Sequence, residues 1–377
     1  MDTIQLQQKI IDYSKTIGID KIGFASASPF EELKSRLLRQ QELGYQSGFE
    51  PKDIEKRTNP EFLLPGAKSI IAIALAYPSK LKDAPRSTRN ERRGLFARAS
   101  WGEDYHHILR DRLQKLEAFI IEKLPDAKLQ SMVDTGELSD RAVAERAGIG
   151  WSGKNCAIIT PEFGSYVYLG EMVTNIPFVP DSPIEDQCGS CRACLDACPT
   201  GALVQGGQIN AQKCVSFLTQ TKDFLPDEFR TKIGNRLYGC DSCQTACPKN
   251  KGIDFHFHEK MKPEPEVVKP LLKPILSISN RDFKETFGSL SGSWRGKKPI
   301  QRNAIIALSH FKDTSAIPEL TKVLKDDPRP VLRGTAAWAL GKIGDESAIE
   351  ILKEASLKEK DEQVLQEIEK GLNMLIN

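Results

Sequence analysis

The sequence lacks the features that send a chain to or across a membrane. Its first residues, MDTIQLQQKIIDYSK, are polar and mixed in charge, without the basic start and apolar run of a secretory signal. No stretch approaches the ~18 uninterrupted apolar residues of a membrane-spanning helix. Nine cysteines in a chain without an export signal indicate metal or redox chemistry rather than disulfides. We therefore expect a cytoplasmic protein with no membrane partner.

Nucleotide-binding signatures are missing as well. No Gly-x-Gly-x-x-Gly follows an expected strand and no Gly-Lys-Ser/Thr loop occurs, so the common nucleotide sites are unsupported. The five histidines form no metal-spaced set with carboxylates. A net charge of only +2 does not indicate a polyanionic partner, although a local basic face is compatible with it. The 377 residues, 40% hydrophobic and 28% charged, predict a globular protein of two or three domains.

The amino-terminal region, residues 1–178, mixes helical and strand patterns and predicts an α/β or α+β domain. Short apolar runs at 21–25 and 69–75 are bounded by turn residues, as buried strands are. An apolar stripe predicts a helix over 105–124, and two further strands, 157–159 and 166–169, predict a hairpin.

Two regions of different composition follow. Residues 179–255 hold eight cysteines and little aliphatic content, so a domain there would depend on its metal for stability. Residues 256–294 are expected to connect and pack on the core. Residues 295–377 repeat: seven positions recur 32 residues later, and each unit reads helix, Asp-containing turn, helix. This pattern is typical of HEAT-like repeats; a plain helical bundle with a chance echo is the alternative.

The cysteine spacing predicts two 4Fe–4S clusters. One run ends in Cys-Pro with the bacterial ferredoxin spacing, and the second is the same motif with its first cysteine displaced upstream. In such motifs the fourth cysteine of each run serves the other cluster. Crossing them assigns cluster one to Cys188, Cys191, Cys194 and Cys247, and cluster two to Cys198, Cys214, Cys240 and Cys243. Zinc is the alternative, since Cys-x-x-Cys pairs also bind zinc.

Two other residues are candidates for chemistry. Cys156 lies outside the cluster pattern beside an expected strand, where a lone cysteine is usually packing. Asp134 follows a strand-like run, and a helix is expected from about 139 to the Gly148 and Gly150 signals. An aspartate facing an apolar cofactor would be desolvated, which would raise its pKa and let it donate a proton. Position alone favours a turn or cap aspartate.

Several stretches together resemble the epoxyqueuosine reductases, and the resemblance covers essentially the whole chain. They are Asp134-Thr135-Gly136-Glu137, Ala147 to Asn155, Leu169-Gly170-Glu171, Cys188 to Leu203, and Tyr238 to Cys243. The resemblance implies a cobalamin-binding catalytic domain over 1–178, a ferredoxin-like domain over 179–255 and HEAT-like repeats. It also implies reduction of epoxyqueuosine to queuosine at the tRNA wobble position, the last step in making queuosine, with Asp134 as proton donor. An electron donor of flavodoxin or ferredoxin type and a monomeric chain complete the expectation.

The sequence departs from the family in two places. Gly136-Glu137 stands where many relatives have Ala-Pro, so contacts to the corrin are expected to differ there. No complete Asp-x-His-x-x-Gly cobalamin motif is present; Asp104-Tyr105-His106 begins like one, but Leu109 occupies the glycine position. We interpret this stretch as a helix entry near the pocket. The candidates for corrin contact, chosen by position, are Arg57, Ser139, Lys154 and Ser216.

Local charge marks the tRNA side. The segment from Trp294 opens the repeat region, and its cations could contact phosphates; the candidates are Lys297, Lys298 and Arg302. A solvated helix entry explains any one of these cations equally well. Two other functions stay open on the residues alone. One is a cobalamin and iron–sulfur reductase or dehalogenase acting on a small molecule, which would not need the repeats. The other is a non-enzymatic electron-transfer or scaffold protein, which would bind no corrinoid.

Overall fold

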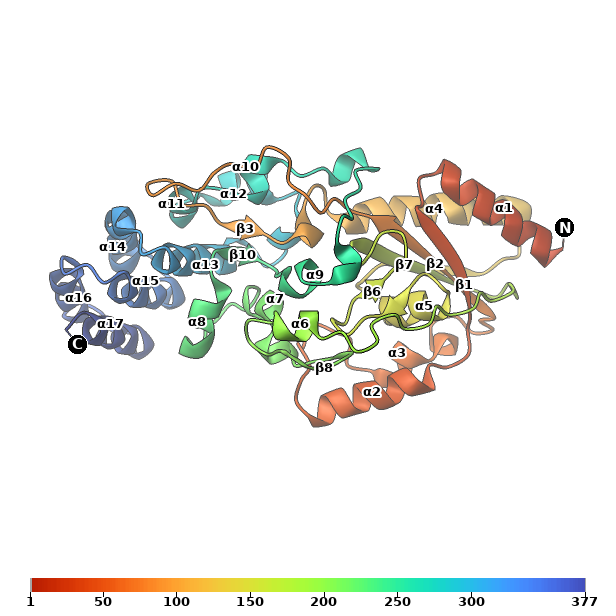
Figure 1. The fold of residues 1–377 in the computed structure, drawn as a ribbon, viewed down its shortest axis with the longest axis horizontal. Helices are drawn as coiled ribbons and strands as arrows, with labels where there is room; N and C mark the ends of the chain where they lie inside the picture. The colour runs from red at the N-terminus through yellow and green to blue at the C-terminus, as the bar shows by residue number, and fades with distance from the viewer. Residues whose placement is uncertain (1, 377) are drawn as a thin grey trace. The chain divides into compact units, whose positions relative to one another are not determined.

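In the computed structural model, which describes residues 2–376, the chain divides into two compact units. The first contains Met1–Lys80, Glu103–Cys214 and Asp241–Lys262, and the second contains Leu81–Gly102, Val215–Cys240 and Pro263–Asn377. The chain therefore passes between the units several times, as the colours of Figure 1 show. The divisions at 178, 255 and 294 follow composition and stay a prediction.

A four-stranded antiparallel sheet forms the centre of the first unit, in the order β1-β2-β7-β4. The strands are β1 (Lys21–Ser26), β2 (Ser69–Ala76), β4 (Leu129–Met132) and β7 (Val167–Thr174). The two predicted apolar runs become β1 and β2, which confirms them as strands. Every residue of β2 is buried because β2 has a strand on each side and helices on both faces.

Helices cover both faces of this sheet (Figure 1). Side chains of β2 alternate between the faces, as the two-residue period of a strand requires. Ile71 and Ile73 pack with α1 (Thr3–Thr16) and with α4 (Tyr105–Lys123), the predicted helix, whereas Ile70 and Ala72 pack with α5 (Asp140–Arg146). Helices α2 (Glu31–Glu42) and α3 (Ile54–Thr58) follow β1. Packing on the sheet therefore positions α4 and α5, and pairing with β7 positions β4.

The predicted hairpin over 157–169 is wrong. Strand β6 (Ile158–Ile159) pairs with β5 (Trp151–Ser152), while β7 pairs with β2 and β4. One isolated bridge, Thr160 with Gly164, is the connection that resembles a hairpin. Strand β7 pairs with β2 on one edge and β4 on the other, and its side chains are buried on the two covered faces of the sheet; a two-stranded hairpin could not provide that burial.

Short elements and the loops between them make up the cysteine-rich part of the first unit. The elements are α6 (Ala193–Asp196), β8 (Leu203–Gln205), β9 (Gln208–Ile209) and α9 (Ser242–Thr245). The turns α6 and α9, one from each cysteine run, pack against each other. Regular structure is sparse here, as expected of a segment organised around metal.

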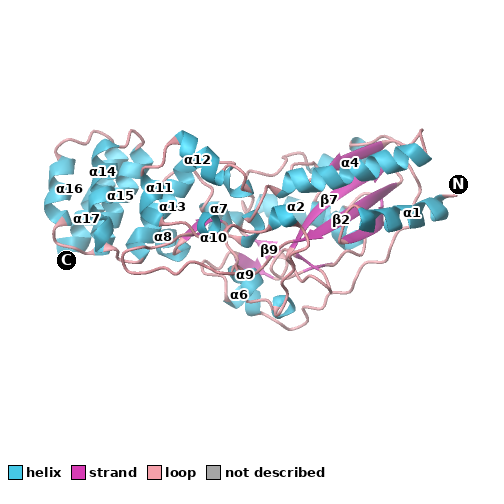
Figure 2. Ribbon diagram, turned by 90° about the horizontal axis from the view of Figure 1, so that it is seen from above, coloured by secondary structure: helices cyan, strands magenta, loops and turns pink. Residues whose placement is uncertain are grey.

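The second unit is largely helical (Figure 2). Its early elements are β3 (Leu95–Phe96), α7 (Val215–Leu218), α8 (Asp227–Ile233), β10 (Arg236–Tyr238), α10 (Pro265–Val268), α11 (Leu272–Leu276) and α12 (Asn280–Phe287). The repeats follow as α13 (Lys297–His310), α14 (Ile317–Asp326), α15 (Pro330–Ile343), α16 (Ala348–Ser356) and α17 (Glu362–Ile376). The helix pairs α13–α14 and α15–α16 confirm the predicted repeat.

The repeated turn has a physical cause. The Asp313 carboxylate accepts the backbone N–H of Ser315, and the Asp345 carboxylate accepts that of Ser347, so the same aspartate turn precedes the second helix of each pair. Helices α15 and α17 approach closely at glycines: a Cβ on Gly341 would lie 2.4 Å from the Cα of Gly371. Among residues 2–376, no helix is both long and apolar enough to span a membrane.

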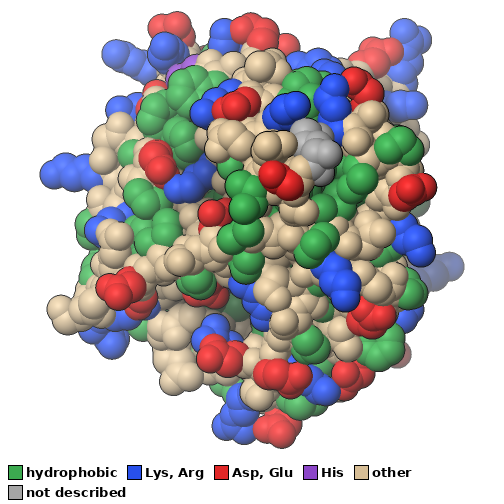
Figure 3. Space-filling model, turned by 90° about the vertical axis from the view of Figure 1, so that its right-hand side faces the viewer, with side chains coloured by type: hydrophobic (Ala, Val, Ile, Leu, Met, Phe, Trp, Pro, Cys, Tyr) green, Lys and Arg blue, Asp and Glu red, His purple; other side chains and the backbone are tan. Residues whose placement is uncertain are grey.

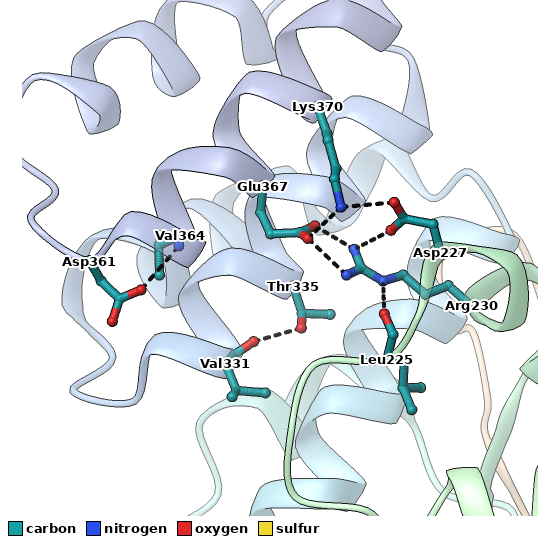
Figure 4. A network of polar contacts seen from close by, with 9 residues as sticks. All are labelled: Leu225, Asp227, Arg230, Val331, Thr335, Asp361, Val364, Glu367 and Lys370. Carbon is teal, nitrogen blue, oxygen red and sulfur yellow. Dashed lines mark hydrogen bonds and ion pairs between the residues drawn. The ribbon is translucent and has the colours of Figure 1, made fainter. Parts of the chain in front are cut away.

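A buried ion pair ties α8 to α17 within this unit (Figure 4). The Arg230 guanidinium binds the Glu367 carboxylate through both terminal nitrogens, one of them at 2.9 Å from Oε1. Lys370 lies 2.9 Å from the same carboxylate and 2.8 Å from Asp227. The pairing satisfies charges that could not otherwise be buried.

Candidate functional site

Asp134 lies directly after β4, at the edge of the antiparallel sheet. Its backbone is left-handed, with φ of 52°, and its N–H donates to the Asp140 carboxylate over 3.0 Å. The side chain is 60% exposed. The carboxyl-end rule of parallel sheets does not apply here, because the neighbouring strand β7 runs antiparallel. The turn geometry and the bond to Asp140 place Asp134, so it is a turn aspartate whose carboxyl remains open to a ligand.

His106 is the basic group beside Asp134. The Asp104 carboxylate caps α4 by accepting a hydrogen bond from the backbone N–H of His106, as is typical of a helix start. The same carboxylate lies 2.7 Å from the imidazole Nδ1 of His106 and accepts its N–H. The other nitrogen, Nε2, lies 3.4 Å from the Asp134 carboxylate, as an ion pair longer than a usual hydrogen bond. Burial lowers the pKa of His106, but the carboxylates of Asp104 and Asp134 outweigh it and raise the pKa to about 9. His106 is therefore an imidazolium at neutral pH.

Two further carboxyls lie behind the loop. Burial raises the pKa of Asp140 to about 6, even though its carboxyl accepts the Asp134 N–H. Burial, together with the neighbouring Asp140, also raises the pKa of Glu171 well above its ordinary value. Sequence reasoning noted these residues only inside motifs and missed their proximity. Hydrophobic periodicity carries no signal for it, since they come from β7, α5 and the loop after β4.

A cavity of about 820 Å³ opens in the first unit, and its lining includes the two neighbours of Asp140 in the chain but neither Asp134 nor His106. It is lined by Arg57 and Ser139, two of the predicted corrin contacts, and by Arg141. The Nε of Arg57 is buried without a hydrogen-bond partner among the described residues, and burial lowers the pKa of this side chain. A buried unpaired donor at a cavity wall fits a ligand rich in acceptors, such as the amides and phosphate of cobalamin.

The other two predicted corrin contacts lie elsewhere. Lys154 donates to the carbonyl oxygens of Gly189 and Cys191, in the first cysteine loop, and does not line the cavity. Ser216 belongs to α7 in the second unit, where its carbonyl accepts the hydroxyl of Thr219. The structure therefore brings together Arg57 and Ser139 but places Lys154 at the cysteine loops.

The thiols assigned to cluster one lie near one another. Burial raises the pKa of Cys194, and the Cys247 and Cys188 thiolates raise it further. Burial likewise raises the pKa of Cys247, as do Cys188 and Cys191. These influences indicate that Cys247 lies near the cysteines of the first run, and the crossed assignment stays a prediction. This donor set fits a thiolate-bound cluster.

Cys198 and Cys156 have contrasting surroundings. The backbone N–H of Ala202 points at the Cys198 sulfur over 3.2 Å, and such bonds lower the pKa of Cys198 in spite of burial. A thiolate stabilised in this way suits a cluster ligand. The predicted packing cysteine, Cys156, has its pKa raised by burial, partly offset by Arg141.

The predicted tRNA contacts differ in exposure. Lys297 donates to the carbonyl of Ile278, and Lys298 is half-buried at the start of α13. Arg302 is only 1% exposed, and its guanidinium donates to backbone oxygens of α7 and the loop after it. This corrects the expectation for Arg302, whose donors are used inside the protein. Figure 3 shows a face of the first unit on which acidic and basic side chains intermingle.

Three family models match the chain. They are described as "Epoxyqueuosine reductase QueG, DUF1730" over residues 57–135, "4Fe-4S double cluster binding domain" over 187–250, and "HEAT repeats" over 296–373. The first includes Asp134 and Arg57. The second includes all eight predicted ligands, and the third covers α13 to α17.

Relatives match over nearly the full length. An epoxyqueuosine reductase of Bacillus cereus is 74% identical over 375 residues, covering 100% of this chain and 99% of that protein. A crystal structure of epoxyqueuosine reductase with an epoxyqueuosine-modified tRNA-Tyr stem loop matches with a TM-score of 0.98 at 69% identity, covering 99% of this chain and 100% of that one. A Bacillus subtilis epoxyqueuosine reductase whose Asp134 catalytic loop is swung out of the active site matches with a TM-score of 0.97 at 68% identity, with the same coverage.

Proposed function

The chain belongs to the epoxyqueuosine reductases, and we infer that it reduces epoxyqueuosine in tRNA to queuosine. The observation that carries this inference is the match to such enzymes over the whole chain. The reaction takes up two electrons and two protons, replaces the epoxide by an alkene and releases one water. A small-molecule reductase is the competing function, and no observation on the structure favours it.

We propose Asp134 as the acid that protonates the departing epoxide oxygen. Its carboxyl is exposed, so a substrate can reach it, while its backbone is held in a fixed turn. The imidazolium of His106, 3.4 Å away, can return a proton to Asp134 after the transfer. Asp104 holds the imidazole in place through Nδ1.

The cofactors are two 4Fe–4S clusters and cobalamin. When bound, they supply the electrons and the reduction at the epoxide carbon. We propose the eight cysteines in their crossed assignment as cluster ligands, and Arg57 and Ser139 as holding cobalamin. The arrangement of thiols around Cys247 and the unpaired Arg57 Nε support these assignments. Lys154 and Ser216 remain weaker candidates, chosen by position.

The partner is tRNA, and we propose the segment before α13 as one of its contacts. Trp294 is 54% exposed, whereas the other three tryptophans are buried. The Arg295 guanidinium lies 4.9 Å from the centre of its ring, and the indole N–H donates to Gln220. A fixed, exposed ring beside Lys297 and Lys298 suits an unstacked base and its phosphates. We also propose a flavodoxin- or ferredoxin-like electron donor, a monomer, and a cytoplasmic location, where tRNA is modified.

The test is turnover by the full chain, loaded with both clusters and cobalamin under anaerobic conditions with a strong reductant. We expect conversion of an epoxyqueuosine-containing tRNA stem loop. Asp134→Asn should abolish conversion while cobalamin, followed by its absorption spectrum after desalting, stays bound. Asp126→Asn, an exposed aspartate of the same unit, is the matched control and should behave as wild type. Failure of the loaded wild-type protein to convert the stem loop would overturn the assigned function.

A further inference from the structure

Glu171 ends the Leu169-Gly170-Glu171 motif, and the reaction as assigned so far does not use it. It lies on β7 and is 1% exposed. Its partners across the sheet are Ala72 on β2 and Met132 on β4. A carboxyl group therefore stands in the middle of a sheet whose neighbouring positions are apolar. Burying a polar group in such a place is costly unless a specific contact compensates it.

Among residues 2–376, both carboxyl oxygens of Glu171 are buried and neither is bonded to an N–H, a hydroxyl or a cation. The group that faces it is a second carboxyl, that of Asp140 at the start of α5. Two carboxyls can form a hydrogen bond only when one carries a proton, and two buried carboxylates would repel each other. Such a pair is favoured when its two carboxyls share one proton.

Asp140 connects this pair to the catalytic loop. Its Oδ2 accepts the backbone N–H of Asp134 over 3.0 Å. That bond fixes a residue whose left-handed φ of 52° is uncommon for a non-glycine residue. An ionised Asp140 is the stronger acceptor for this N–H. The pair therefore works best with its proton on Glu171 and its charge on Asp140.

We propose that Glu171 is a positioning residue of the reductase, which carries a proton, donates it to Asp140, and so keeps the Asp140 carboxylate directed at the backbone of Asp134. The proposal deepens the assigned function and rests on Asp134 being its acid. Glu171 touches neither substrate nor cofactor in this role. Its effect reaches the reaction through the placement of the Asp134 carboxyl.

Several titratable groups lie around the pair formed by Glu171 and Asp140. Asp134 faces the pair from the loop after β4, and His106 at the start of α4 lies next to Asp134, with Asp104 as its other partner. Arg110, also on α4, donates to Thr135 over 3.4 Å. A raised pKa means that the fold keeps a proton that the unfolded chain loses above its ordinary value of 4.5. Stability from this group is therefore greatest at low pH and declines as pH rises through the raised pKa.

Two variants of the loaded enzyme separate positioning from mere packing. Glu171→Gln keeps a neutral donor toward Asp140 at every pH, whereas Glu171→Leu keeps the volume and removes the donor. We expect Glu171→Leu to lower the single-turnover rate on the stem loop roughly 100-fold, with its KM nearly unchanged, because the acid is misplaced. Glu171→Gln should keep most of the wild-type rate. In wild type, part of the decrease of the rate at alkaline pH comes from this pair, and Glu171→Gln should lack that part.

Infrared difference spectroscopy tests the proton directly and does not depend on turnover. Wild type should show the C=O stretch of a protonated carboxyl near neutral pH, and Glu171→Gln should lack it. The band could be lost in Glu171→Gln while even wild type converts no stem loop. That combination would support the shared proton and overturn the assigned function instead. An unchanged band in Glu171→Gln would overturn the proposal. So would a Glu171→Leu enzyme as fast as wild type, or a folded Glu171→Gln enzyme as slow as Glu171→Leu. Should Glu171→Leu fail to fold, the pH profile and band of Glu171→Gln still decide.

Discussion

Replacing Glu367 by glutamine should loosen α17, the last helix of the repeats, more than any exposed charge change could. Arg230 is 2% exposed and Glu367 side chain 7% exposed, so both members of the pair are buried (Figure 4). Glutamine has nearly the same shape but presents an amide N–H₂ to one guanidinium nitrogen. Asp227, the remaining carboxylate near Arg230, is about half exposed and 3.4 Å away. Breaking a buried pair on one side costs about 3–5 kcal/mol.

Hydrogen exchange of the α17 amides is the suitable assay, because a chain of two units need not unfold in one step. A loss of about 3–5 kcal/mol corresponds to about two to four orders of magnitude in protection of the slowest amides. The control is Glu285→Gln, which breaks the exposed Arg281–Glu285 pair, 84% and 61% exposed. That change should cost less than about 1 kcal/mol. Equal effects of the two variants would refute the view that the buried pair secures α17.

Three further results are expected. Cys247→Ser should remove cluster one and about half of the iron, while the electron paramagnetic resonance signal of cluster two persists. Cys214→Ser should remove cluster two and leave the signal of cluster one. Loss of the same signal in both variants would contradict the crossed assignment. Lys298→Glu should weaken stem-loop binding and reduce its salt slope by roughly 1, whereas Arg302→Gln should lower stability without changing that slope. His106 should titrate by NMR at a pH of about 9. Its stabilising contribution should be complete below pH 6.5 and should be lost as the pH rises through about 9. A midpoint below 6.5 would contradict the ion pair with Asp134.

The features that sequence predicted well are those that depend on neighbours in the chain. The strands β1 and β2, the helix α4 and the repeated turns at Asp313 and Asp345 follow from local periodicity and turn chemistry. The crossed role of Cys247 rests on a spacing rule that already encodes a distant contact, and it stays a prediction. For these features the sequence contains the physical cause within a short window.

The features that sequence missed depend on partners far along the chain. The hairpin expected at 157–169 failed because β7 finds two longer partners, β2 and β4. Arg302 was expected to face tRNA, but carbonyl groups some 80 positions earlier take its donors. A basic residue at a helix start looks the same in sequence whether it meets phosphate or backbone. Burial separates the two, and burial is set by the tertiary fold.

The arrangement around Asp134, which we propose as the acid, separates the chemistry of its carboxyl from the positioning of its backbone. The carboxyl must be exposed to reach a substrate, so it cannot be fixed by packing, and its backbone N–H carries the fixing bond instead. Asp134→Asn should therefore remove the proton but leave the loop in place, since the backbone bond survives. Asp140→Ala should leave the acid intact but free the loop, whose left-handed turn then lacks its main support. Both variants should lose turnover, but the loop should stay protected from hydrogen exchange in Asp134→Asn and lose protection in Asp140→Ala. Equal protection in the two variants would contradict the role of Asp140 in holding the loop.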